Sequence, residues 1–218
     1  MIITEISRQA KNANRYNIFI DGEFAFGISD FDLLNQRLFK GMEIDAALLD
    51  KLQNELEYTK ARDVAVAYLG RSPRSAAEIK RKLTEKEFSS ASINRVMDLL
   101  TDNGYIDDVT FAVQLISHRT KTSNHGKRRI VGELVQKGVA KDDIIAAYHH
   151  LFDEDEGENE IAAATAALAK KLRNINISDI ADNAKELSRL TAFLARRGFG
   201  YDVIKKVMAN ILNEENAG

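Results

Sequence analysis

Residues 79–100, IKRKLTEKEFSSASINRVMDLL, resemble two later stretches of the same chain, IVGELVQKGVAKDDIIAAYHHL at 130–151 and LTAFLARRGFGYDVIKKVMANI at 190–211. When the three are aligned without gaps, seven of the 22 columns are apolar in all three copies. Independent draws at the 44% apolar content of the chain would give about two such columns. The sequence therefore predicts an internal repeat, and the repeat decides the fold.

Each copy is expected to be a unit of three helices, because the aligned stretch has the apolar spacing of two helices and a third helical pattern precedes it. The preceding helices are predicted at 61–70, 109–121 and 160–173. Units of this kind in tandem have mostly local contacts and form an elongated, curved array, which favours a binding surface over a closed active-site pocket.

Turn residues support the same division. Lys137-Gly138 and Arg197-Gly198 close the first aligned helix in the second and third copies, as a helix C-terminus favours. The first copy has Lys86-Glu87 instead, so its turn has to be built without glycine. The expected domains are an N-terminal segment, 1–59, followed by three repeats at 60–108, 109–153 and 154–218.

Helix boundaries in the first repeat are marked by capping residues. Ser75 and Glu78 form a capping box after the only proline, Pro73. Asn103-Gly104 ends the next helix, and Asp107 or Asp108 caps the one after it. The low proline content itself favours a mainly helical chain.

The first thirty residues differ, because they alternate apolar and polar residues as strands do. Asp21-Gly22 supplies the positive φ angles of a tight hairpin turn. We expect a small antiparallel hairpin or sheet of two or three strands. Ser29 or Asp30 then caps a short helix that runs through Leu38, and Asp45 opens another helical segment.

Composition limits the function. The 218 residues include no cysteine, which removes disulfides and thiolate metal sites and agrees with a reducing compartment, so the cytoplasm is expected. No stretch is long and apolar enough to span a bilayer, so no membrane association is expected. The net charge of −2 divides into −4 over 1–59, +6 over 60–129 and −4 over 130–218. A basic middle can hold a polyanion or an acidic protein groove, or can simply be a solvated helical surface.

The sequence lacks an evident catalytic apparatus. There is no cysteine nucleophile or Gly-x-Ser-x-Gly motif, and the four histidines, each expected at the surface, have no spacing of a zinc pair. Asp107 and Asp108 fit helix caps better than acid–base catalysis. The acidic run DEDEGENE at 153–160 lacks calcium-loop spacing and is expected to be a solvated connector. We therefore expect no enzyme, no catalytic residues, no cofactor and no metal.

Lysines and arginines of the basic middle cluster near the starts of the expected second and fifth helices, where they could hold phosphates together with exposed backbone amides. Three-helix units also resemble helix-turn-helix DNA readers. One hypothesis is therefore a stand-alone DNA-binding regulator built of tandem helical units, whereas an alternative is that the clusters meet acidic protein surfaces.

Several motifs occur in a specific order: YLGRSPRS at 68–75, EIKRKL at 78–83, GYIDDVTFA at 104–112 and GKRRIVGELVQKGV at 126–139. In this order and spacing they resemble the RecX family, bacterial regulators of the RecA recombinase. The resemblance covers roughly residues 60–215, and the N-terminal hairpin resembles the β extension of longer members. Glu87, where glycine is common, and the long third unit depart from the pattern.

The resemblance implies a non-catalytic protein that lodges in the helical groove of the RecA–DNA filament and bridges neighbouring protomers. Such proteins inhibit ATP hydrolysis, strand exchange and co-protease activity of RecA in recombination, DNA repair and the SOS response, and some also bind DNA. The expected partners are the RecA filament and single- or double-stranded DNA, and the chain is expected to be a monomer. The expected contact residues are basic: Arg71, Arg74, Arg81, Lys82, Arg119, Lys127, Arg128, Arg129, Arg196 and Arg197.

Overall fold

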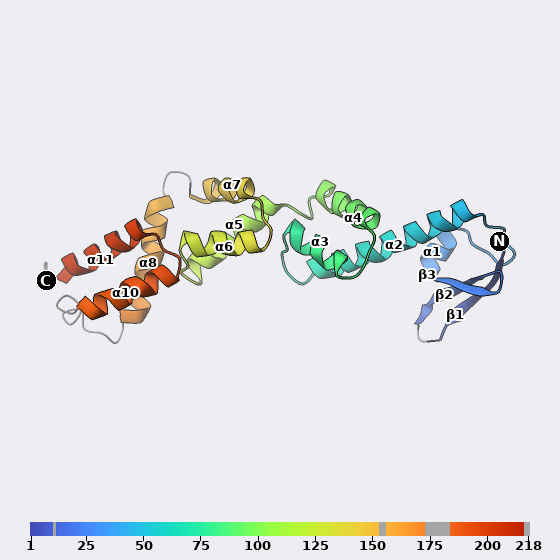
Figure 1. Cartoon of the computed structure of the whole chain (residues 1–218), viewed down its shortest axis with the longest axis horizontal. Helices are drawn as coiled ribbons and strands as arrows, with labels where there is room; N and C mark the ends of the chain where they lie inside the picture. Colours follow the sequence, from blue (N-terminus) through green and yellow to red (C-terminus); the bar gives the residue numbers. More distant parts are fainter. Residues whose placement is uncertain (11, 153–155, 173–183, 216–218) are drawn as a thin grey trace. The chain divides into compact units, whose positions relative to one another are not determined.

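The computed structural model describes residues 1–10, 12–152, 156–172 and 184–215. These residues form a mainly helical chain with one three-stranded sheet at its N-terminal end (Figure 1). The chain divides into two compact units, one made of 1–72 and 79–103 and the other of 73–78 and 104–218. Each unit is described by itself.

The sheet of the first unit is antiparallel, in the order β1-β2-β3 (Figure 1). Its strands are β1 (Ile3–Gln9), β2 (Asn12–Ile20) and β3 (Glu23–Ser29). Between β2 and β3, Asp21 has a φ of 50° and Gly22 a φ of 90°. Positive φ at both central residues is the requirement of a type I′ hairpin turn, so the predicted turn is confirmed.

Alternate residues of the strands point to one buried face, which is the core of this part of the unit. Its members come from the sheet, from the segment after it and from the first half of the next long helix: Ile3, Ile18, Ile20, Phe26, Ile28, Leu38, Ile44, Leu52 and Leu56. A small sheet is only marginally stable alone, and the apolar helix residues stabilise this one by packing against its buried face.

The short helix α1 (Asp30–Asn35) begins at Ser29, whose side chain accepts a hydrogen bond from the backbone of Asp32. The helix is shorter than the sequence predicted. Arg37 adopts a φ of 51°, which cannot continue a right-handed helix, and the chain turns there. Leu38, expected in the helix, is instead buried with the sheet residues.

The next helix, α2 (Ala46–Leu69), is 24 residues long and is capped by Asp45, as predicted. Its first half packs against the sheet, whereas Ala61 and Ala65 are buried in its second half, which contacts α4 (Ser90–Asp102). The helix predicted at 61–70 is therefore the end of a longer one, and the predicted boundary between residues 59 and 60 lies inside a continuous helix.

The remaining helices follow the repeat. They are α3 (Ala76–Thr84) before α4, then α5 (Asp108–Lys121), α6 (Lys127–Gln136) and α7 (Lys141–Phe152), then α8 (Glu156–Leu172), α10 (Ala184–Arg196) and α11 (Tyr201–Glu215). All seven aligned apolar columns are buried or half-buried in each repeat. Tandem three-helix repeats are thus confirmed, and helical periodicity was the right basis for predicting them.

The turn after the first aligned helix has one geometry in all three repeats. Gly138 and Gly198 have φ values of 78° and 91°, and Glu87, at the equivalent position, has a φ of 61°. The following residue donates its N–H to a leucine carbonyl in each repeat, as Phe88 does to Leu83 at 3.4 Å. The first repeat therefore builds the same turn without glycine by placing a glutamate in the left-handed region.

The acidic run at 153–160 is partly helical. Residues 153–155 lie outside the described residues, and 156–160 are the beginning of α8 rather than part of the expected connector. Within the described ranges no group of acidic residues or histidines is arranged to hold a metal ion. No described helix is long and apolar enough to cross a membrane.

Candidate functional site

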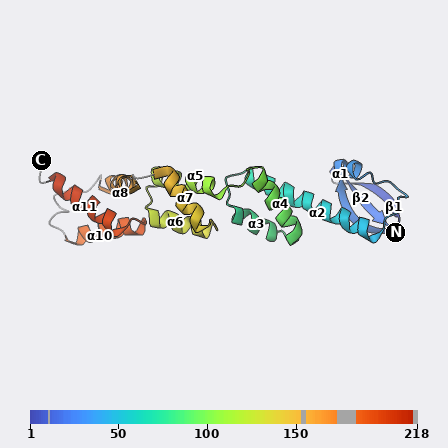
Figure 2. The ribbon, with the colours of Figure 1, turned by 90° about the horizontal axis from the view of Figure 1, so that it is seen from above.

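The C-terminal end of α10 meets the N-terminal end of α6 within the second unit (Figures 1 and 2). The N–H of Gly126 donates to the Arg197 carbonyl at 2.9 Å, and the N–H of Arg128 donates to the Gly198 carbonyl at 3.1 Å. A Cβ at Gly126 would overlap the backbone of Gly198 and Phe199. The two helices therefore stack end to end because glycine allows their backbones to touch, and the carbonyl end of one faces the amide end of the other.

This contact brings together basic residues that are far apart in the sequence. We call them the basic junction: Lys127, Arg128, Arg129, Arg196 and Arg197. The Arg129 guanidinium donates to the Arg196 carbonyl at 3.4 Å. Of these side chains, those of Arg128 and Arg196 are exposed and contact no partner among the residues that the structure describes. Half of the expected contact residues thus lie at one contact between two helix ends, and two of them, Arg128 and Arg196, have exposed side chains.

Arg197 has a structural position in this cluster. Its guanidinium donates to the carbonyls of Ser123 at 2.6 Å and Asn124 at 3.2 Å, and it lies 4.9 Å from the ring centre of Phe193. Asn124 is buried with a φ of 47°, so the arginine satisfies carbonyls of a tight turn. Its expected role as a partner contact stays a prediction, and its Nη1 is already engaged.

Arg119 is likewise engaged. It makes two hydrogen bonds to the Glu133 carboxylate, of 2.6 and 2.8 Å, and both side chains are partly buried. The hydrogen bond from Arg119 holds the pKa of Glu133 below its ordinary value, despite an opposing effect of burial. The bidentate ion pair joins α5 to α6.

His125 lies beside the junction and is not the surface histidine that the sequence predicted. Its Nδ1 is buried and has no hydrogen-bond partner among the described residues. Burial lowers the pKa of His125, and Arg129, Arg197 and Arg119 lower it further. Burial and, after it, the neighbouring arginines therefore favour the neutral imidazole.

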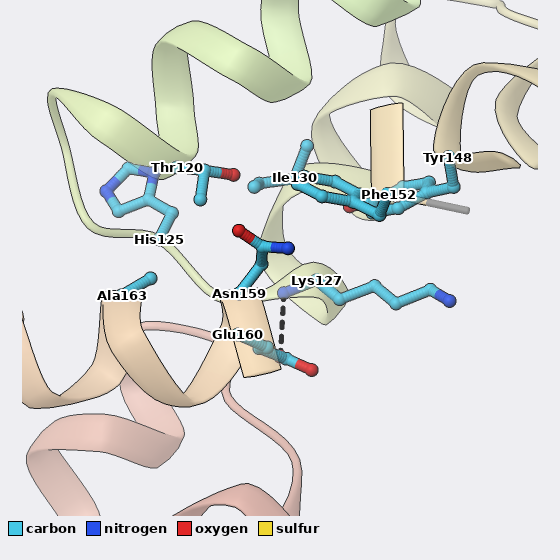
Figure 3. A pocket seen from close by; sticks show the side chains of 9 residues that line it. All are labelled: Thr120, His125, Lys127, Ile130, Tyr148, Phe152, Asn159, Glu160 and Ala163. Atoms are coloured by element: carbon cyan, nitrogen blue, oxygen red, sulfur yellow. Dashed lines mark hydrogen bonds between the residues drawn. The ribbon is translucent and has the colours of Figure 1, made fainter. Parts of the chain in front are cut away.

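Next to His125 is a small cavity, and Figure 3 shows the side chains that line it. Its volume is about 20 Å³, which is room for about one water molecule. At its edge the backbone N–H of Lys127 donates to Glu160 at 3.1 Å, drawn as a dashed line in Figure 3. Because Glu160 and the Gly198 carbonyl already accept from the first amides of α6, this helix start does not offer the exposed amides that the sequence suggested for phosphate binding.

Arg74 lies at a second contact of the same kind, which involves the 73–78 segment of the second unit. Ser75 Oγ donates to the Lys137 carbonyl at 2.5 Å, and Lys137 Nζ lies 2.9 Å from Glu78 Oε1. Arg74 lies 3.6 Å from the same Glu78 carboxylate. Burial raises the pKa of Glu78, but these partners together with the Ser75 N–H lower it more. The predicted capping box is confirmed, and Arg74 belongs to a charged network rather than to an open surface.

The first unit holds the other expected contact residues. Arg71 is exposed, and within the described part of the chain its side chain has no partner. Arg81 and Lys82 both lie near Glu85, at 4.0 and 3.4 Å. Ion pairs this exposed contribute little to stability, so Arg81 and Lys82 can leave Glu85 to contact a binding partner.

Sequence reasoning missed the carboxylate that organises this unit. Glu57 of α2 accepts hydrogen bonds from the backbone and side chain of Ser89 and from the Ser92 hydroxyl at 2.6 Å. It thereby caps α4 from a different helix, 32 residues away from Ser89 in the sequence. No local sequence pattern predicts such a contact, because its two partners belong to separate helices.

Comparison with known proteins gives one consistent result. Family models match at 1–45 (Regulatory protein RecX N-terminal domain), 61–100 (RecX, first three-helix domain), 107–147 (RecX, second three-helix domain) and 158–208 (RecX, third three-helix domain). The chain is 32% identical to Regulatory protein RecX of Bacillus subtilis over 98% of its own length and 78% of the relative's. It is 29% identical to Regulatory protein RecX of Clostridium botulinum over 98% and 97%.

Two solved structures are also similar. A crystal structure of regulatory protein RecX matches with a TM-score of 0.67 and 25% identity, covering 95% of this chain and 98% of the other. The crystal structure of RecX from Lactobacillus salivarius matches with a TM-score of 0.61 and 22% identity, covering 71% and 96%. At 22% identity, the similarity to the Lactobacillus salivarius structure shows the fold alone.

Proposed function

Because this chain belongs to the RecX family of regulatory proteins, we propose that it modulates RecA by binding the RecA–DNA filament. The family is non-catalytic, and membership in it implies RecA as the partner. In the proposed mode of action the chain lodges in the filament groove and bridges neighbouring protomers. Bridging restricts the movement of neighbouring RecA protomers relative to each other. The proposed result is inhibition of ATP hydrolysis, strand exchange and co-protease activity of RecA.

The observation that carries the proposal is the basic junction. Arg128 and Arg196 come from separate helices whose ends meet at this contact, and both side chains are exposed. Arginine is suited to carboxylates and phosphates alike, because its planar group can make paired hydrogen bonds. A RecA–DNA filament offers both kinds of acceptor, so the junction fits the filament better than it fits a small ligand.

The alternative, a stand-alone reader of duplex DNA, receives less support from the same unit. In a helix-turn-helix module the second helix enters the major groove with its first residues against the bases. In the second repeat this helix is α7, whose first turn carries Asp142 and Asp143. Carboxylates at that position repel DNA phosphates, which argues against base reading by this repeat.

The test is the DNA-dependent ATP hydrolysis of RecA in the presence of the wild-type chain or of the double variant Arg128→Glu/Arg196→Glu. Wild type should suppress hydrolysis, and the double variant should need about tenfold more protein for the same suppression, since two favourable charge contacts become repulsive. Both side chains are exposed, and the glutamate that replaces Arg128 would stand in the first turn of a helix, where a negative charge is favourable.

The matched control is Lys40→Glu/Lys51→Glu, two charge reversals at exposed positions of the first unit. It changes the net charge by the same amount as the double variant and should leave suppression unchanged. If both variants lose suppression of ATP hydrolysis equally, the effect is due to net charge alone. If wild type does not suppress hydrolysis, the proposed function is wrong.

A further inference from the structure

We propose that the groove between α6 and α7 binds an acidic amphipathic helix on the RecA filament; this deepens the proposed function and rests on it. The groove has a volume of about 480 Å³, within the range of ligand-binding sites. Its lining comes entirely from the second repeat: Lys127, Val131, Val135, Lys141, Ile144, Ile145, Tyr148 and His149.

Two of the lining residues are apolar and exposed without serving the repeat core. The exposed fraction is 58% for Val135 and 45% for Ile145. Neither belongs to the seven apolar columns that the three repeats share, so folding does not require them to be apolar. Together with the half-buried Val131 they form an apolar floor that water covers in the free chain. Covering this floor with a partner would release that water and favour binding.

The charges around the floor select the partner. Lys127 and Lys141 are among the eight lining residues, and none of the eight is acidic. Lys127 also belongs to the basic junction, so the groove and the basic junction share a residue. An occupant with apolar side chains on one side and carboxylates along its edges complements both features.

An apolar floor also distinguishes between classes of macromolecule. Val131, Val135 and Ile145 have no side-chain donors for phosphate oxygens, so a nucleic acid would leave its backbone charges without partners there. A helix lying between two helices presents apolar residues at positions i, i+3 or i+4, and i+7, a spacing that suits a groove of this kind. The groove therefore fits a protein segment, whereas the arginines of the basic junction can meet either protein or DNA.

The direct test measures binding of fluorescently labelled chain to filaments of RecA on single-stranded DNA. Val135→Glu and Ile145→Glu place a charge on the floor and should each weaken binding about tenfold, as truncations at interface hot spots do. Both side chains are exposed, so the fold should persist, and circular dichroism verifies this. The matched control is Val66→Glu on α2, where the side chain is 53% exposed and lies outside the groove; it should bind as wild type does.

The outcomes separate the groove from the proposed function. If wild type binds the filament and the two groove variants bind equally well, the groove inference is overturned while the proposed function stands. If wild type itself does not bind, the proposed function fails first. If the groove variants and Val66→Glu weaken binding alike, the loss is not specific to the floor, and the inference is again overturned.

Crosslinking identifies the occupant. Because the chain has no cysteine, Ile145→Cys gives a single site for a thiol-reactive benzophenone. Irradiation with the filament should attach it to a RecA peptide that carries acidic residues and apolar residues at helical spacing. Attachment to DNA, to a second copy of the chain or to a RecA segment without acidic residues would contradict the inference.

Discussion

The hydrogen bond between the Gly126 N–H and the Arg197 carbonyl occupies the same place in the repeat as the one between Ser75 Oγ and the Lys137 carbonyl. Gly126 follows Ser75 by 51 residues and Arg197 follows Lys137 by 60, which are the offsets of the aligned repeats. The second unit therefore uses one kind of contact twice: the residue before a middle helix donates a hydrogen bond to a carbonyl at the end of the next middle helix. This contact also assembles the basic junction.

Gly126→Ala should destabilise the second unit by roughly 1–3 kcal/mol, because its Cβ would overlap backbone atoms of Gly198 and Phe199 that cannot rotate away. The control is Gly132→Ala in the middle of α6, where a Cβ meets nothing within 4 Å. That change should instead stabilise by roughly 1 kcal/mol, the helix-propensity difference. Urea unfolding of both variants checks the pair, and equal effects would mean that the close approach is not required.

Glu87→Gly should raise the free energy of unfolding by roughly 0.5–1 kcal/mol. A non-glycine residue in the left-handed region costs roughly 1–2 kcal/mol, and the greater freedom of glycine in the unfolded chain offsets part of that gain. Lys86→Gly is the control, because Lys86 is not among the residues with positive φ and should lose stability. Thermal unfolding measures both, and a lower midpoint for Glu87→Gly would contradict the assigned turn.

Arg119 and Arg128 should respond differently to truncation. Arg119→Ala leaves the partly buried Glu133 without its partner and should cost roughly 1–2 kcal/mol of stability. Arg128→Ala removes an exposed side chain and should change stability by less than about 0.5 kcal/mol. Filament binding at a temperature where both variants are folded should show the reverse order, a larger loss for Arg128→Ala. Similar stability for the two variants would show that the ion pair contributes nothing.

The stability of the second unit should fall as the pH drops below the ordinary histidine pKa of 6.5. Burial and three arginines lower the folded-state pKa of His125, so the unfolded chain binds a proton that the folded chain does not. His125→Gln cannot titrate and should flatten this part of the profile. Urea unfolding of both proteins between about pH 7.5 and 5.5 tests the sign. A parallel profile in the variant would assign the pH dependence to other groups.

Periodicity and turn chemistry predicted the elements that depend on local sequence. The repeat, the hairpin at Asp21-Gly22 and the capping box at Ser75 follow from interactions within a few residues, and each is present. The end of α1 was predicted too late because the left-handed Arg37 has no sequence signal. Residues of this kind adopt positive φ only when tertiary contacts favour it.

The candidate site was less predictable, because charge clusters in sequence do not reveal which side chains are already paired. Arg119 and Arg197 resembled Arg128 in the sequence, yet the structure engages the first two and leaves the third exposed. The domain boundaries and the elongated, curved arrangement stay predictions. So do the partner contacts of the basic residues, DNA binding, the monomeric state and the cytoplasmic location.

The central claim is that the chain acts by binding the RecA–DNA filament through its basic junction. Its most direct test is the equilibrium affinity of the labelled chain for RecA filaments and for the same DNA without RecA, measured at several salt concentrations. We predict tight, salt-sensitive binding to the filament, much weaker binding to bare DNA, and a smaller salt dependence for Arg128→Glu/Arg196→Glu. Equal affinity for bare DNA and filament, or a double variant that binds the filament as wild type does, would contradict the account.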